Sequence, residues 1–290
     1  MTGDTIPLRC ADATVTITPL GAELTSWQIN GRELIWHRDP QHWARSAPIL
    51  FPVVGASAGG AVKVDGKSYP MPQHGFARDS VFDVIEQDGD FVLLRLADNA
   101  QTRERYPFAF SFAVRYTLSD DGIAIAFEVT NPGTAPLPYQ IGYHPAFPWP
   151  FATRRAGHDA VTFATGAPRA ILRPDAKGLL KRKADDSLSG GRMELSAAMF
   201  DKGAFVFADA HSDKVVFTPA CGGELGITTE GFPHVAVWTK PDAPFISIEQ
   251  WTGLPDWDDF TGELSERASV SVLPPGGAAH HAIALRYSAA

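Results

Sequence analysis

The chain has 290 residues, of which 44% are hydrophobic and 20% charged, a composition typical of a globular protein with a large buried core. Its formal net charge of −8 argues against nucleic acid as a partner, because phosphate binding favours a basic surface. The sequence shows neither an apolar run of membrane-spanning length nor the features of a signal peptide, so we expect a cytoplasmic protein with no membrane partner. Cys10 and Cys221 match no metal-ligand spacing; we expect two free thiols, and a disulfide between them is the alternative.

Strand signals dominate the chain. In chain order, alternation of apolar with polar or small residues predicts strands at 13–19, 91–96, 110–118, 123–129, 214–218, 234–239, 245–249, 268–273 and 282–287. A glycine-containing turn between the third and fourth of these predicts an antiparallel hairpin.

Helical signals are scarce. The best one, residues 195–200, is long enough for a turn or two, and the polar stretch 154–191 is expected to be a long surface excursion. Strands without alternating long helices exclude a doubly wound α/β fold and favour an all-β sandwich or barrel. No internal repeat or domain boundary is visible, so we expect one domain over residues 1–290.

His74 and Arg78 occur in the segment His-Gly-Phe-Ala-Arg. If this segment is extended, residues 74, 76 and 78 project from one face, so that the imidazole and the guanidinium can reach one polar ligand. The guanidinium fork suits sugar hydroxyls, carboxylates or phosphates. The alternative is an arginine in a surface ion pair beside a histidine that caps a turn.

His144 lies between an apolar strand signal and Pro145, which restricts it to extended conformations. An imidazole can donate a proton near neutral pH. The aromatic residues around it, at positions 139, 143, 147 and 149, are the kind of wall on which sugar rings stack. The alternative is a buried histidine that is hydrogen-bonded to the backbone.

Glu249 ends a predicted strand in which Phe245, Ser247, Glu249 and Trp251 share one face. Burial beside the indole would raise the pKa of the carboxyl group towards a value useful for proton abstraction. The alternative is an exposed glutamate at the end of a strand.

Other polar clusters carry less information. Asp256, Asp258 and Asp259 are expected to form a solvated acidic loop, and His280 and His281 fit no metal spacing. The sequence has no glycine-rich phosphate loop, no serine nucleophile elbow and no paired metal-ligand cysteines. We therefore expect no metal, no nucleotide cofactor and no covalent serine chemistry.

Taken together, seven segments resemble the aldose 1-epimerase (galactose mutarotase) superfamily, especially a bacterial branch near the hexose-6-phosphate mutarotases. They occur in family order and cover nearly the whole chain: residues 21–24, 47–55, 74–78, 106–108, 142–147, 238–241 and 247–251. The resemblance implies a β-supersandwich of large antiparallel sheets, with a sugar bound in a groove on a concave face. It implies no cofactor.

The resemblance also implies roles for individual residues. Glu249 matches the catalytic base of the family, and His144 matches its catalytic acid. His74 matches a histidine that contacts the sugar, and Arg78 follows it as in this branch. Asp201, with imperfect spacing, matches an aspartate that binds sugar hydroxyls.

The substrate implied is a small sugar or a sugar phosphate, acted on by a monomer or homodimer. Galactose mutarotases proper carry an Asn-Arg pair where this chain has residues 51–55, so galactose itself is not implied. Arg45 could contact a substrate anion or lie at the surface. The alternative function is a non-catalytic carbohydrate-binding or sugar-sensing protein on the same scaffold. A glycosidase ranks last, because it needs two carboxylates and the sequence offers one strong candidate.

Overall fold

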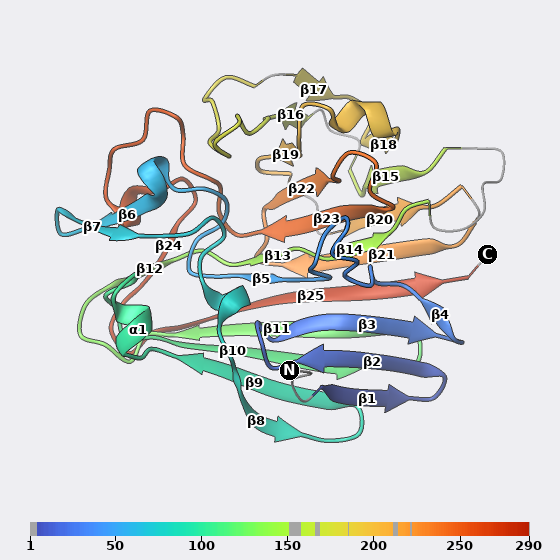
Figure 1. Ribbon diagram of the computed structural model, residues 1–290, viewed down its shortest axis with the longest axis horizontal. Coiled ribbons are helices and arrows are strands. Elements are labelled where there is room, and N and C mark those ends of the chain that lie inside the picture. Colours follow the sequence, from blue (N-terminus) through green and yellow to red (C-terminus); the bar gives the residue numbers. More distant parts are fainter. Residues whose placement is uncertain are drawn as a thin grey trace.

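The largest element of the fold is an antiparallel sheet of nine strands. A computed structural model, shown in Figure 1, describes residues 5–150, 158–165, 169–184, 186–210, 214–220 and 222–289. In spatial order the strands of this sheet are β18 (Arg192–Glu194), β15 (Ala160–Phe163), β20 (Lys214–Thr218), β21 (Glu224–Glu230), β25 (Ala278–Ser288), β11 (Gly122–Thr130), β10 (Ser111–Leu118), β9 (Phe91–Ala97) and β8 (Asp83–Gln87).

Two smaller antiparallel sheets cover one face of the large sheet. The first has six strands: β19 (Phe205–Phe207), β22 (His234–Trp238), β23 (Phe245–Trp251), β13 (Gly142–Tyr143), β5 (Ile49–Leu50), and β14 (Ala146–Pro148), which also pairs with β23. The second has four strands: β1 (Ile6–Cys10), β2 (Ala13–Thr18), β3 (Glu23–Ile29) and β4 (Arg32–Glu33).

Aromatic side chains fill the space between the layers. Phe127 of β11 lies 6.3 Å from the ring of Tyr143 in β13, and Phe163 of β15 lies 4.9 Å from Phe207 in β19. On the side of the four-stranded sheet, the hydroxyl of Tyr116 in β10 donates to the carbonyl oxygen of Ala22, just before β3, at 2.8 Å. Both smaller sheets therefore pack on the large sheet, and the core lies between the large sheet and the two smaller ones.

Short elements complete the described chain. Three two-stranded sheets pair β6 (Ala61–Val64) with β7 (Lys67–Pro70), β12 (Leu137–Tyr139) with β24 (Ser271–Leu273), and β16 (Arg169–Ile171) with β17 (Asp186–Leu188). The helices are α1 (Ala100–Arg103) and the 3₁₀ helices Ala58–Gly60, Ala77–Asp79, Ala197–Phe200 and Leu264–Glu266. Within the described ranges, none of them is long and apolar enough to cross a membrane.

The all-β prediction is confirmed, and the predicted hairpin is β10–β11. Leu118 pairs with Ile123 at its turn, and Phe112, Val114 and Tyr116 point into the core as the alternation indicated. Each of the nine predicted strands overlaps a strand of the structure. The 195–200 signal is the 3₁₀ helix Ala197–Phe200. Cys10 carries a free thiol in β1, whereas Cys221 lies outside the described residues.

The prediction that 154–191 is a surface excursion is wrong in part. Strand β15 lies inside the nine-stranded sheet, paired with both β18 and β20, and the side chains of Val161 and Phe163 are buried in the core. The run is only four residues long, which is too short for its alternation to stand out against polar neighbours.

Helix α1 begins with a capping box formed by Asn99 and Thr102. The Asn99 side chain accepts hydrogen bonds from the backbone N–H groups of Gln101 (2.9 Å) and Thr102 (3.0 Å), which have no partner within so short a helix. We expect Asn99→Ala to lower the free energy of unfolding by about 1 kcal/mol. Denaturant titration measures this. The control is Gln101→Ala, which leaves the cap in place, and an equal loss in both variants would contradict the capping role.

Candidate active site

The carboxyl group of Glu249 lies in the middle of the buried strand β23. All seven residues of this strand are buried, because it lies between β22 and β13 with side chains packed on both faces. The strand continues to Trp251, so the expectation that Glu249 ends the strand is wrong. The Trp251 indole donates from Nε1 to Glu249 Oε2 at 3.0 Å, which leaves Oε1 for another partner.

That partner is His144. Its Nε2 lies 3.2 Å from Glu249 Oε1, and both side chains are buried. His144 follows β13 and precedes β14, which pairs with β23 so that Ala146 is opposite Ser247. The chain between β13 and β14 therefore places the imidazole beside the carboxyl group.

Tryptophan side chains enclose the imidazole of His144. The Trp43 ring lies 4.9 Å from it at 31°, and the Trp238 ring lies 5.7 Å from it at 89°. The predicted aromatic wall at positions 139, 143, 147 and 149 is wrong, because Tyr139, Tyr143, Phe147 and Trp149 belong to the core. Trp43 and Trp238 flank the site instead.

His74 enters the site from a turn. Its φ of 69° and the φ of 74° at Gly75 lead into the 3₁₀ helix Ala77–Asp79, so the extended segment predicted for 74–78 is wrong. A side chain at position 75 would overlap the carbonyl group of Phe51, which explains the glycine there. The turn nevertheless brings His74 within 5.7 Å of the His144 ring.

The protonation of His74 follows from its neighbours. The backbone N–H of Gly55 donates to His74 Nδ1 at 3.1 Å, so in the neutral ring the proton is on Nε2. Burial, together with the nearby His144 and Arg78, holds the pKa of His74 well below its usual range. His74 is therefore a neutral ring with an N–H to donate.

Arg78 lies beside His74 and is mostly enclosed, with 19% of its side chain exposed. Its Nη2 donates to the carbonyl oxygen of Gln73 at 2.7 Å. Its Nε is buried without a hydrogen-bond partner among the residues that the structure describes, since Asp79 Oδ2 at 3.9 Å is too far. Behind it, Arg45 forms an ion pair with Asp79 at 2.7 Å.

Four of the five predicted site residues line one pocket of about 420 Å³. The full lining is Trp43, Gly55, Gln73, His74, Arg78, His144, Pro174, Asp175, Ala176, Lys177, Gly178, Gly203, Ala204, Trp238, Glu249, Trp251 and Pro255. Asp201 is exposed after the 3₁₀ helix Ala197–Phe200 and is not part of this lining, although Gly203 is. The role of Asp201 stays a prediction.

Sequence reasoning missed several lining residues. Trp43 and Gln73 come from loops, and Lys177 comes from a turn in which the Asp175 carboxylate accepts from two backbone N–H groups. Loop residues have no periodicity to mark them. The tryptophan at 43, close to the conspicuous 47–55 segment, was the one available signal.

Burial favours the uncharged form of both members of the central pair. It raises the pKa of Glu249 well above its usual range, against the opposing effects of the Trp251 hydrogen bond and Arg78. Burial and Arg78 lower the pKa of His144 to about 3. A 3.2 Å contact needs a proton between the two atoms, so the pair shares one proton that rests on the carboxyl group.

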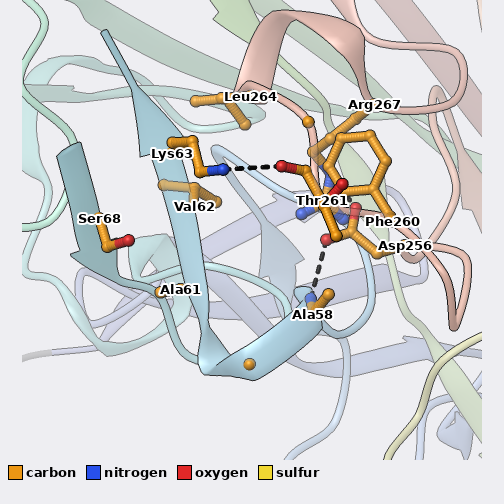
Figure 2. Close-up of a pocket in the computed structure, with 12 residues that line it drawn as sticks. Ala58, Ala61, Val62, Lys63, Ser68, Asp256, Phe260, Thr261, Leu264 and Arg267 are labelled. Carbon is orange, nitrogen blue, oxygen red and sulfur yellow. Dashed lines mark hydrogen bonds and ion pairs between the residues drawn. The ribbon is translucent and has the colours of Figure 1, made fainter. Parts of the chain in front are cut away.

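Figure 2 shows a second pocket, of about 270 Å³, between β6 and the loop that follows β23. Asp256 is buried there, with its carboxylate 3.2 Å from Arg267 Nε and accepting from Ala58 N at 2.8 Å. The prediction of a solvated loop is therefore wrong for Asp256, whereas Asp258 and Asp259 are exposed. Because the Asp256 carboxylate already has partners within the protein, we interpret this pocket as part of the structural framework and not as a ligand site.

Among the residues that the structure describes, no group of three or more histidine, cysteine, aspartate or glutamate side chains could hold a metal ion. The fold and site together define a class of protein: an antiparallel β-sandwich with a buried carboxyl–imidazole pair in an aromatic pocket.

Comparisons with known proteins identify the family. The family described as aldose 1-epimerase matches residues 4–165. Protein LacX of Lactococcus lactis is 30% identical over 284 residues, which cover 93% of this chain and 95% of LacX. A galactose mutarotase-like protein from Lactobacillus casei is 27% identical with a TM-score of 0.89, and covers 98% of this chain and 100% of its own. A galactose mutarotase related enzyme from Lactobacillus acidophilus is 26% identical with a TM-score of 0.90, and the match covers 99% of this chain and 98% of that enzyme.

The chain therefore belongs to the aldose 1-epimerase family. This confirms the resemblance and the galactose mutarotase-like fold. It also supports an isomerase-type role in carbohydrate chemistry.

Proposed function

We propose that the protein is an aldose 1-epimerase that interconverts the α and β anomers of an aldose or aldose phosphate. The observation that carries this proposal is the 3.2 Å contact between His144 Nε2 and Glu249 Oε1 at a pocket of about 420 Å³. Opening a hemiacetal ring needs one group that accepts the proton of the anomeric hydroxyl and one that donates a proton to the ring oxygen, and a buried acid–base pair that shares one proton provides both.

The resting and reactive forms of the pair differ by one proton transfer. Before sugar binds, Glu249 holds the proton and the imidazole of His144 accepts a hydrogen bond. Transfer across 3.2 Å gives a carboxylate base and an imidazolium acid. Arg78 favours the carboxylate, since its positive charge lowers the pKa of Glu249.

Ring opening then uses both groups at once. Glu249 takes the proton from the anomeric hydroxyl while His144 gives its Nε2 proton to the ring oxygen. The bond between the anomeric carbon and the ring oxygen breaks, and the anomeric C–O bond becomes a carbonyl. After rotation of the aldehyde, His144 takes back the proton and Glu249 returns its own, so the ring closes as the other anomer. Both groups end in their starting states.

The remaining side chains of the pocket suit a polyhydroxylated ligand. The Nε2–H of His74 is a donor without a partner among the described residues, and a sugar hydroxyl can accept from it. The guanidinium of Arg78 adds a positive charge to the same pocket lining. The Trp43 and Trp238 rings offer an apolar flank for a sugar face.

The test is an anomer-exchange assay by polarimetry or NMR. Freshly dissolved α-glucose, α-galactose and glucose 6-phosphate are followed with and without the protein. We expect equilibration faster than the uncatalysed rate for at least one sugar. Equilibration at the uncatalysed rate for all three, together with calorimetric binding of a sugar, would favour the non-catalytic binding function instead.

We also expect an unusual pH dependence. The pair works while it holds one mobile proton. A second proton enters only near the His144 pKa of about 3, and the first leaves only above the raised pKa of Glu249. The value of kcat/KM, which reports the free enzyme, should therefore not fall as the pH is lowered from about 7 to about 5. It is measured by polarimetry at constant ionic strength, with the uncatalysed rate subtracted. A loss of activity on acidification that is centred near 6.5, the ordinary pKa of histidine, would contradict this account.

A further inference from the structure

Ser247 lies on the same face of β23 as Glu249, two residues earlier, and is fully buried. Its Oγ is 2.8 Å from His144 Nδ1 and 2.8 Å from the carbonyl oxygen of Pro145. The hydroxyl therefore joins the ring nitrogen that faces away from Glu249 to the backbone beside His144.

Only one placement of hydrogens satisfies both contacts. A carbonyl oxygen can only accept, so the single hydroxyl proton of Ser247 points at Pro145. The Oγ must then accept from His144, which places a proton on Nδ1. The neutral imidazole consequently presents a bare Nε2 to the protonated carboxyl group of Glu249.

Resting on the function proposed above, we propose that Ser247 is a positioning residue that keeps the Nδ1 proton on His144 throughout the reaction. With Nδ1 protonated, any proton that Nε2 acquires belongs to an imidazolium, which gives it up readily. Without this constraint the ring could hold its only proton on Nε2, and a neutral imidazole N–H is a far weaker acid.

The contrast with His74 shows what this contact adds. The Gly55 N–H donates to His74 Nδ1 and so places its proton on Nε2, the opposite tautomer. Two imidazoles with centroids 5.7 Å apart are therefore set differently by their neighbours. One is set to donate a hydrogen bond, and the other is set to transfer a proton.

The direct test is an NMR measurement on the wild-type protein. The ring nitrogens are observed in long-range ¹H–¹⁵N correlations of protein labelled with ¹⁵N-histidine. The signals of His144 are assigned, among nine histidines, by their loss in His144→Gln. We expect Nδ1 of His144 to show the shift of a protonated nitrogen at neutral pH. A bare Nδ1 would overturn the proposal.

A substitution tests the consequence. Ser247→Ala should lose the protonated character of Nδ1 and lower kcat with little change in KM. We expect a loss of about 10- to 100-fold, by analogy with removal of the hydrogen-bond partner of a metal-bound histidine. Ser247→Thr, which keeps the hydroxyl, should restore both. An unchanged Nδ1 shift in Ser247→Ala would overturn the proposal.

The matched control is Thr239→Val. Thr239 is a buried hydroxyl that donates to the carbonyl oxygen of Phe245, at the start of the same strand, at 2.6 Å. Its loss should change stability but leave the His144 shifts and kcat as in the wild type. The NMR result does not depend on turnover. If the protein were inactive on every sugar tried, the proposed function would be contradicted, but the NMR measurement would still show which nitrogen of His144 carries the proton.

Discussion

Glu249→Gln should lower kcat for anomer interconversion by about 10²–10⁴-fold, the usual contribution of a positioned general acid–base group. The amide keeps the size of the carboxyl group, and its oxygen can still accept from Trp251 Nε1. It cannot take a proton from the anomeric hydroxyl. Sugar binding should be largely retained, so the loss should appear in kcat rather than in KM. Exchange of anomer signals at equilibrium, followed by NMR, measures the rate.

The control for this substitution is Glu33→Gln. The carboxylate of Glu33 accepts from Trp27 N and Ser26 Oγ within the four-stranded sheet, so the change is chemically the same but lies outside the pocket. Glu33→Gln should keep its activity. Activity in Glu249→Gln within about threefold of the wild type would remove Glu249 from the mechanism.

The effects of substituting Glu249 and His144 on the rate should not be independent. Because one proton passes between them, removing either leaves the other without its partner. Glu249→Gln combined with His144→Gln should therefore cost much less than the product of the two single losses. Losses that multiply would mean that the two groups act in separate steps.

The fold could be predicted from the sequence where strands are long and have one buried face. Strand β10 alternates over eight residues, and its period is visible without any knowledge of its partners. Strands β5 and β13 have two residues each, and so short a run has no period. Such short strands form because they pair with a neighbouring strand. A single sequence does not show which strands will be neighbours.

The same distinction applies to the site. The placement of His144 and Glu249 is local: Pro145 extends the chain at one, and alternation aligns the other with Ser247. The turn at His74 is not local, since its positive φ depends on the packing of Gly75 against Phe51. The burial of Asp256 likewise depends on Arg267, which the acidic run at 256–259 gives no reason to expect.

Arg267→Met should destabilise the protein by about 3–5 kcal/mol, the usual cost of removing one partner from a buried ion pair. Arg267 contacts Asp256 at 3.2 Å, and both side chains are almost completely buried. The guanidinium also donates to Ser57 Oγ at 2.6 Å and to Val54 O at 3.1 Å. Without it, a carboxylate and a hydroxyl lose buried partners at once. Denaturant unfolding measures the change.

A surface pair provides the control. Arg182 and Asp259 also form an ion pair, at 3.1 Å, but both side chains are about 60% exposed. Arg182→Met should change the free energy of unfolding far less than Arg267→Met does, because solvent screens an exposed pair. Equal losses in the two variants would mean that burial of the Asp256–Arg267 pair is not what makes it important.

The loss in Arg267→Met should shrink as the pH falls. Burial already raises the pKa of Asp256, and Arg267 opposes that rise, so the variant should hold this carboxyl at a still higher pKa. Between the unfolded and folded pKa values the folded state binds more protons, so stability falls as the pH rises through that window. Asp256→Asn added to Arg267→Met should recover part of the loss at neutral pH, because the uncharged amide needs no cation. Arg267 also donates to the carbonyl oxygen of Val54, the residue before Gly55, so the ion pair is linked to the backbone that donates to His74 in the pocket.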